Sequence, residues 1–195
     1  MDSLTRIKII RLIDTQKKIL PLPSPKIHLQ ILDFLNNKHK FSVLCASRGL
    51  AKSTLVSQIY LPTYILETKQ DENIHIYSES LIKAKNFFED TKTIISLLEG
   101  AGFNIQIKYW SKAYCEVCNE WGQTIILSPH SVSQDVRGSK QNFIRPTLII
   151  CDDIESKSIS SKWNAKTRLG REKLEGFFYA DLLPSLDEKG RLILL

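Results

Sequence analysis

Short strand-like runs alternate with longer helical patterns along most of this 195-residue chain. The strand-like runs cover residues 41–45, 73–77, 102–109, 147–151 and 190–195. Patterns of helical period lie between or beside them, at residues 28–35, 53–66, 80–100 and 174–186. Strands that alternate with helices favour an α/β fold, with a central, mostly parallel β-sheet flanked by helices on both faces.

Two further features complete the expected organisation. Residues 114–119 and 124–127 are strand-like runs joined by a short turn, which predicts one antiparallel hairpin. Residues 1–20 are basic and periodic, and the proline cluster at 21–25 separates them from the rest. We therefore expect an N-terminal helical segment at 1–24 and one globular domain at 25–195.

The composition excludes several classes of protein. Hydrophobic residues make up 43% of the chain, and glycine and proline are sparse, which argues against disorder. The start of the chain is too charged for a secretory signal, and no apolar stretch approaches the roughly 20 residues that span a bilayer. We expect a soluble intracellular protein. The net charge of +6 fits nucleic-acid binding, but equally fits a lysine-rich solvated surface.

The four cysteines favour packing over metal binding. Cys115 and Cys118 form a single C-x-x-C motif, and a zinc site would need two more ligands at suitable spacing. Cys45 and Cys151 lie in apolar runs, where we expect small buried side chains.

The segment CASRGLAKST, residues 45–54, follows a strand-like run and precedes a helical pattern. It resembles the phosphate-binding pattern G-x-x-x-x-G-K-[ST], with Ala46 and Ala51 in place of the glycines. Lys52 would contact the β- and γ-phosphates, and the Ser53 hydroxyl would ligate Mg²⁺. Alanine can replace glycine where φ stays negative, so the two alanines do not forbid the fold of such a loop. Taken alone, the segment favours an ordinary helix start capped by Ser47.

A second motif lies 100 residues further on, where the apolar run 147–151 ends in Asp152 and Asp153. An acidic pair after a buried strand is typical of a Walker B motif, in which one carboxylate orders Mg²⁺ and the next polarises the attacking water. Asp152 is the expected metal residue. Asp153 is the expected catalytic acid, with Glu155 as its competitor. The alternative for the pair is a solvated turn, which the presence of Lys52 and Ser53 disfavours.

Arg48 lies inside the loop, four residues before Lys52. It is expected either to stabilise charge on the γ-phosphate or to be solvated. The full set of expected loop residues for nucleotide binding is Ser47, Arg48, Gly49, Leu50, Ala51, Lys52, Ser53 and Thr54.

Together these motifs resemble the ATPase domain of the large terminase subunit, the motor that packages DNA into the heads of tailed phages. The resemblance rests on R-G-L-A-K-S at 48–53, the strand and helix from residue 74 onward, Arg137-Gly138, and R-P-T-L-I-I-C-D-D at 145–153. It covers roughly residues 25–195. It implies a P-loop NTPase fold of the RecA-like (ASCE) type and a Mg²⁺-dependent ATPase that uses ATP.

The resemblance also implies roles that the residues alone do not. Gln30 falls where terminases place a glutamine that reads adenine, although an exposed polar residue is the equal alternative. The run 190–195 resembles the strand before the family's coupling motif, so we expect this chain to lack that motif and the nuclease domain that follows it. Implied partners are double-stranded DNA, the portal of the procapsid, the small terminase subunit and further copies in a ring, with a monomer possible in isolation. The implied location is the host cell cytoplasm, without membrane contact.

The sequence leaves alternatives open for one basic segment and for the function of the whole chain. The basic segment 157–173 could contact DNA phosphates or a neighbouring subunit, or be a solvated loop. The alternatives for the whole chain are a helicase-like P-loop ATPase acting on nucleic acid, and a catalytically silent nucleotide-binding assembly module.

Overall fold

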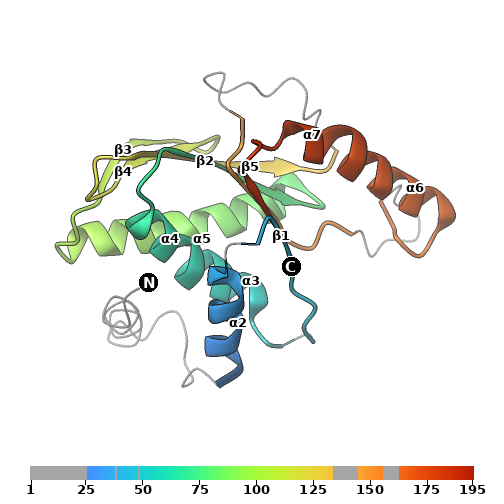
Figure 1. Ribbon diagram of the computed structural model, residues 1–195, viewed down its shortest axis with the longest axis horizontal. Coiled ribbons are helices and arrows are strands. Elements are labelled where there is room, and N and C mark those ends of the chain that lie inside the picture. Colours follow the sequence, from blue (N-terminus) through green and yellow to red (C-terminus); the bar gives the residue numbers. More distant parts are fainter. Residues whose placement is uncertain (1–25, 38, 48, 134–144, 156–162) are drawn as a thin grey trace.

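The computed structural model describes residues 26–37, 39–47, 49–133, 145–155 and 163–195 (Figure 1). The expected N-terminal helical segment at 1–24 lies outside these residues, as do Arg48 and the Arg137-Gly138 pair. Within the described residues, no helix is both long and apolar enough to cross a membrane.

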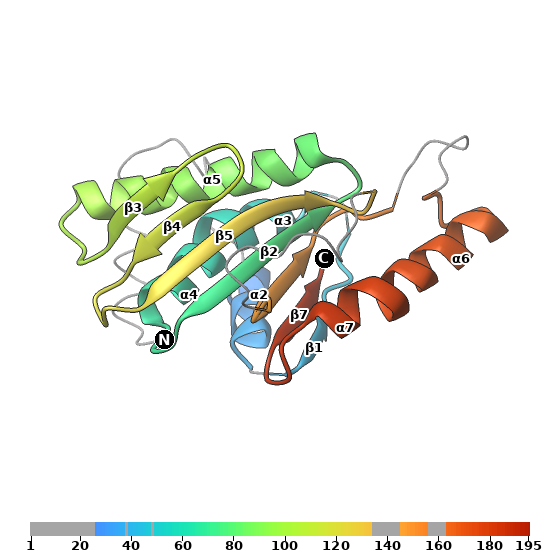
Figure 2. The same cartoon turned by 90° about the horizontal axis from the view of Figure 1, so that it is seen from above.

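A seven-stranded sheet forms the centre of the molecule, in the order β1-β7-β6-β2-β5-β4-β3 (Figure 2). The strands are β1 (Phe41–Val43), β2 (Glu72–Ser78), β3 (Gln106–Trp110), β4 (Cys115–Cys118), β5 (Thr124–Ser131), β6 (Leu148–Cys151) and β7 (Arg191–Leu194). Every pairing from β1 to β5 is parallel, and β3 and β4 add antiparallel strands beyond β5. The predicted mostly parallel sheet and the antiparallel hairpin are therefore confirmed.

Helices cover both faces of this sheet. On one face lie α2 (Lys26–Asn36), α3 (Lys52–Leu55), the π-helical turn η1 (Val56–Tyr60), α4 (Leu61–Glu67) and α5 (Leu81–Gly100). On the other lie α6 (Arg168–Gly176), the π-helical segment η3 (Phe177–Leu182) and α7 (Leu183–Ser185). Figure 1 shows α2 to α5 below the sheet and α6 and α7 above it.

The central strands bury both faces, as their continuous apolar sequences require. In β6, Leu148 and Ile150 pack into the core shared with α2, α4 and α5, whereas Ile149 and Cys151 pack into the core under α6 and η3. Successive side chains of a strand point to opposite faces, so four consecutive apolar residues fill two cores. Packing on both faces therefore holds the carboxyl end of this strand, which Asp152 directly follows, in a rigid position.

The helical segment after β1 runs without interruption from Lys52 to Glu67, because η1 connects α3 to α4. The helix α5 begins as expected, with the Ser80 side chain accepting a bond from the Lys83 amide at 3.4 Å. The helix α6 begins at Arg168, six residues before the expected start, because Thr167 caps it by accepting from the Gly170 amide at 3.0 Å. A side chain at Gly170 would lie 1.9 Å from the Asn164 carbonyl oxygen, so this turn needs glycine.

The strand β5 is longer than expected. Residues 128–131 are polar or proline and lie beyond the strand-like run expected at 124–127, yet they continue the parallel pairing with β2 up to Ser131. The pairing with β4 stops at Leu127. One edge of β5 is therefore free of β4 at Pro129, which fits the rule that proline within a sheet occurs where an edge is open.

Arg191 ties the start of β7 to the end of α2. Its guanidinium donates to the Leu35 carbonyl at 2.8 Å, to the His39 carbonyl at 3.2 Å and to the Tyr60 hydroxyl at 3.3 Å. Three donors of one rigid group thus join β7, α2 and η1. This fixes α2 beside the loop that follows β1.

Candidate nucleotide-binding site

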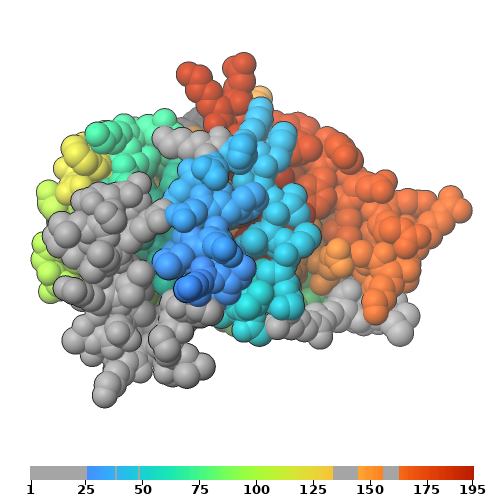
Figure 3. All heavy atoms as spheres, turned by 60° about the horizontal axis from the view of Figure 1, so that its bottom comes forward, coloured from blue at the N-terminus to red at the C-terminus, as the bar shows by residue number. Residues whose placement is uncertain are grey.

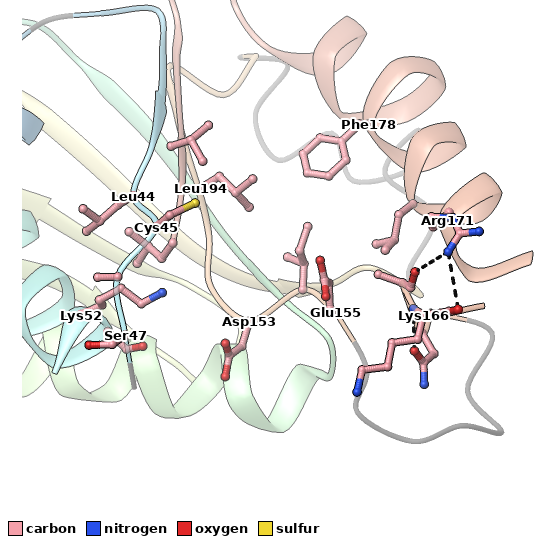
Figure 4. Close-up of a pocket in the computed structure, with 18 of the residues that line it drawn as sticks. Leu44, Cys45, Ser47, Lys52, Asp153, Glu155, Lys166, Arg171, Phe178 and Leu194 are labelled. Atoms are coloured by element: carbon pink, nitrogen blue, oxygen red, sulfur yellow. Dashed lines mark hydrogen bonds between the residues drawn. The ribbon is translucent and has the colours of Figure 1, made fainter. Parts of the chain in front are cut away.

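A pocket of about 1140 Å³ opens at the carboxyl ends of β1 and β7, between the loop after β1 and the helix α6 (Figure 4). Open α/β sheets bind ligands at this edge. Its residues come from the loop, from the segment after β6, from α6 and η3, and from the end of β7. They include Ser47, Gly49, Ala51, Lys52, Ser53, Thr54, Asp153, Glu155, Lys166, Arg171, Phe178 and Leu194.

The loop after β1 leaves the start of α3 open to an anion. The residue that precedes the helix is Ala51, which offers no side-chain cap. Ser47 does not cap it either, and its exposed side chain lines the pocket. The first amides of a helix have no partner inside the helix, and they attract anions together with the helix dipole. The alternative of an ordinary helix start capped by Ser47 is therefore not what the structure shows.

The negative φ at which alanine can replace glycine without strain is not found at Ala51. Ala51 has φ 50° and ψ 36°, and Gly49 has φ 90°. A left-handed backbone suits glycine, and it costs other L-residues about 1–2 kcal/mol. The last loop residue before the helix adopts a left-handed backbone conformation, and alanine is strained in it.

Ala51→Gly is expected to raise the free energy of unfolding by about 0.5–1 kcal/mol, because glycine adopts this φ without a steric penalty. Urea unfolding at neutral pH measures the difference. Ala101→Gly is the matched control: Ala101 has φ −85°, where alanine is unstrained, so glycine there should destabilise the fold. Equal destabilisation by both changes would contradict the strain at Ala51.

The two motifs meet at one hydrogen bond. The Ser53 hydroxyl donates to the Asp152 Oδ1 at 2.7 Å, across 99 residues of sequence. Burial raises the pKa of the Asp152 carboxyl, and the neighbouring Asp153 also raises it. The bond from Ser53 and the positive charges of Lys52 and Lys83 lower it in part. A cation bound beside Asp152 would therefore stabilise the charged form of its carboxylate.

Asp153 and Glu155 both line the pocket and are exposed. Asp153 has φ 46°, a strained left-handed conformation, and its carbonyl accepts a bond from the Glu79 amide at 3.2 Å. Figure 4 shows both acids between the loop after β1 and the α6 side of the pocket. The choice of catalytic acid between them stays a prediction.

The wall opposite the loop carries cations and an aromatic ring. Lys166 and Arg171 line the pocket there with Phe178, and Arg171 donates to the carbonyls of Ala165 at 3.2 Å and Lys166 at 3.5 Å. The basic composition of 157–173 indicated positive charge but not its place. The structure puts these two members on the pocket wall.

Other expected residues lie elsewhere. Gln30 is exposed on α2 and is not among the residues that line the pocket, so its role in reading adenine stays a prediction. Leu50 also does not line the pocket, and its carbonyl accepts a bond from His28 on α2. Sequence reasoning missed His28, because a single histidine on a helix has no distinguishing pattern. The Arg48 prediction falls outside the described residues.

The cysteines differ in part from expectation. Cys151 is buried as expected, but Cys45 is exposed and lines the pocket. Cys115 and Cys118 lie three apart on β4, so their side chains point to opposite faces of the sheet. In the described part of the chain, no group of three or more histidine, cysteine or acidic side chains could hold a metal ion.

The class of protein follows from the fold and the site. A mostly parallel sheet, a phosphate-type loop after β1, an acidic pair after β6, and β7 between these two strands define a P-loop NTPase-like fold of the ASCE type.

Solved structures of large terminases from phages share this fold. The large terminase of a thermophilic bacteriophage matches with a TM-score of 0.59 and 12% sequence identity, over 89% of this chain. The HK97 bacteriophage large terminase matches with 0.56 and 14%, over 95%. The ATPase domain of the Thermus phage P74-26 large terminase matches with 0.55 and 15%, over 93%.

This chain spans 39% of the first of these chains, 37% of the HK97 chain and 67% of the P74-26 ATPase-domain chain. No protein-family model matches the sequence, and no curated protein matches it. At these identities the comparison establishes the fold, namely that of large terminase ATPase domains.

Proposed function

We propose that this chain is the ATP-hydrolysing motor domain of a viral large terminase subunit, which powers movement of double-stranded DNA into the procapsid. The observation that carries the proposal is the 2.7 Å bond between Ser53 and Asp152 beside an uncapped helix start. A hydroxyl and a carboxylate in contact at a phosphate loop are the two protein ligands that P-loop enzymes offer to Mg²⁺.

The residues fit a Mg²⁺–nucleotide complex. Magnesium usually takes one or two protein carboxylates together with substrate phosphates, and Ser53 and Asp152 supply a hydroxyl and a carboxylate for this purpose. Burial makes the Asp152 charge unfavourable without a cation. When bound, Mg²⁺ would neutralise charge on the β- and γ-phosphates.

The chain's own residues have distinct roles in this proposal. Lys52 and the amides of residues 48–53 hold the phosphates, and Asp152 orients the metal ligands. Asp153 or Glu155 accepts a proton from the attacking water. Arg48 senses or stabilises the γ-phosphate, and Gln30 reads the adenine. Lys166 and Arg171 add positive charge on the opposite wall of the pocket. The pocket volume of about 1140 Å³ is large enough for a nucleotide.

The partners belong to the same proposal. A large terminase from a thermophilic bacteriophage has been crystallised with ADP and with ATP-gamma-S, which supports ATP as the ligand here. We propose double-stranded DNA, the portal of the procapsid, the small terminase subunit and further copies in a ring as partners. The work would take place in the host cell cytoplasm.

Hydrolysis of ATP by the purified chain in the presence of Mg²⁺ tests the proposal. If the chain is a packaging motor, portal-bearing procapsids with double-stranded DNA are expected to raise the rate of ATP hydrolysis, whereas single-stranded DNA is not. Stimulation by single strands alone would favour a helicase-like ATPase. Nucleotide binding without hydrolysis, even with procapsids and DNA, would favour a silent assembly module.

A further inference from the structure

We propose that His28 is a positioning residue, which holds the Leu50–Ala51 peptide with its N–H turned toward the phosphates. The inference rests on the proposed nucleotide site. His28 lies on the inner face of α2, with 6% of its surface exposed, and its Nε2 is 3.1 Å from the Leu50 carbonyl oxygen. A carbonyl only accepts, so Nε2 carries the proton and donates.

The orientation of the neighbouring amide follows from peptide geometry. A trans peptide is planar, and its C=O and N–H point in opposite directions. When His28 holds the Leu50 oxygen on the α2 side, the Ala51 N–H is directed away from α2. Leu50 does not line the pocket, whereas Ala51 does. Figure 3 shows α2 beside the segment that follows β1.

The same peptide needs support because Ala51 is strained. Rotation of the Leu50–Ala51 peptide changes φ of Ala51, which is 50° in the observed orientation. A left-handed alanine is unfavourable by an energy comparable to that of one net hydrogen bond. Without the bond from His28, the strain would favour a rotated peptide with negative φ and a misdirected N–H.

The environment of His28 fits this role better than simple packing. Among the described residues its buried Nδ1 has no hydrogen-bond partner, which costs free energy that an apolar side chain would avoid. The helix that carries His28 is also fixed in place, because Arg191 binds the Leu35 carbonyl at its end. A rigid support of this kind is what precise positioning of a binding group requires.

The proposal is tested with ADP and Mg²⁺ as the probe, by calorimetric titration. His28→Leu and His28→Asn are expected to weaken ADP binding about five- to tenfold, since leucine cannot donate and asparagine is too short to reach Leu50. His28→Gln, whose amide nitrogen falls near the position of Nε2, is expected to restore most of the affinity. Leu29→Ala is the control, at an exposed position on the same helix.

A second readout needs no nucleotide. The three-bond coupling between the amide and α protons of Ala51 reports its φ, and it is expected to change in His28→Leu and His28→Asn but not in His28→Gln. Folded His28→Asn with unchanged Ala51 coupling and unchanged ADP affinity would overturn the inference. If the parent chain fails to bind ADP, the proposed function fails, while the coupling still decides whether His28 orients the peptide.

Discussion

Replacing Lys52 with alanine, or Asp152 with asparagine, is expected to lower the rate of ATP hydrolysis at least about 100-fold. Lys52 supplies the positive charge at the loop, and Asp152 supplies the carboxylate in contact with Ser53. Both groups would act on the charge of the Mg²⁺-bound phosphates, which is redistributed as the nucleotide reacts. Initial rates of phosphate release at saturating Mg²⁺ measure the effect.

The expected effect of Asp152→Asn on stability separates a loss of catalysis from a loss of folding. Burial raises the pKa of Asp152 above its ordinary value, so the folded chain binds a proton there more tightly than the unfolded chain does. At neutral pH the carboxylate therefore destabilises the fold. Asp152→Asn keeps an oxygen for Ser53 and removes the charge, so it should unfold at a higher urea concentration than the parent.

Lys112→Ala is the matched control for Lys52→Ala, because Lys112 is exposed in the turn between β3 and β4 and does not line the pocket. Its ATPase rate should equal that of the parent. Parent-like hydrolysis by both Lys52→Ala and Asp152→Asn would show that the site is misassigned.

The same assay decides between the two candidate acids. Removing the charge of the residue that activates water should abolish ATP hydrolysis but leave the affinity for nucleotide unchanged. We expect this of Asp153→Asn more than of Glu155→Gln, because Asp153 directly follows Asp152, the proposed metal residue. The reverse order would assign the role to Glu155.

Much of the fold could be predicted because local sequence and tertiary context agree. The run at 147–151 is apolar almost throughout, as a strand buried on both faces requires, and Ser80 caps a helix of regular pattern. Residues 128–131 show the limit. Their polar side chains resemble a loop, and only pairing with β2 makes them a strand. Tertiary context overrides propensity in such cases.

The proximity of Lys52, Ser53 and Asp152 could be predicted because phosphate and metal chemistry restricts residue type, while their roles stay predictions. The left-handed backbone of Ala51 could not be predicted, because alanine ordinarily signals the opposite. Nor could His28, whose contact depends on how α2 packs beside β1. Residues that support a site carry weaker sequence signals than those that touch the ligand, because many side chains can donate one hydrogen bond.

Acidification from pH 7 to pH 5 is expected to lower the free energy of unfolding by about 4 kcal/mol through the buried His75 and the partly buried His130. His75 on β2 and His130 on β5 have ring centroids 4.4 Å apart, and His130 also lies 5.0 Å from Tyr77. The His130 Nε2 bonds the Ser128 hydroxyl at 2.8 Å. Both rings lie in or beside the sheet, where an imidazolium would lose its hydration.

The sign follows from the direction of the shifts. Burial lowers the pKa of His75 from 6.5 to about 3, with a contribution from His130, and burial lowers the pKa of His130 to about 4. The unfolded chain therefore binds protons more readily below pH 6.5. The stability contributed by the neutral rings is fully present above pH 6.5 and is lost progressively toward pH 4. At pH 5 each histidine accounts for about 2 kcal/mol.

Urea unfolding at pH 7, 6 and 5 measures this loss. His75→Phe, which keeps an aromatic ring, and His130→Gln, which keeps a polar group for Ser128, should each remove about half of the change between pH 7 and pH 5. His39→Gln is the control, because His39 is exposed and lies outside the β2–β5 core. A parent protein equally stable at pH 7 and pH 5 would mean that water reaches the two rings and that the β2–β5 core is not packed as described.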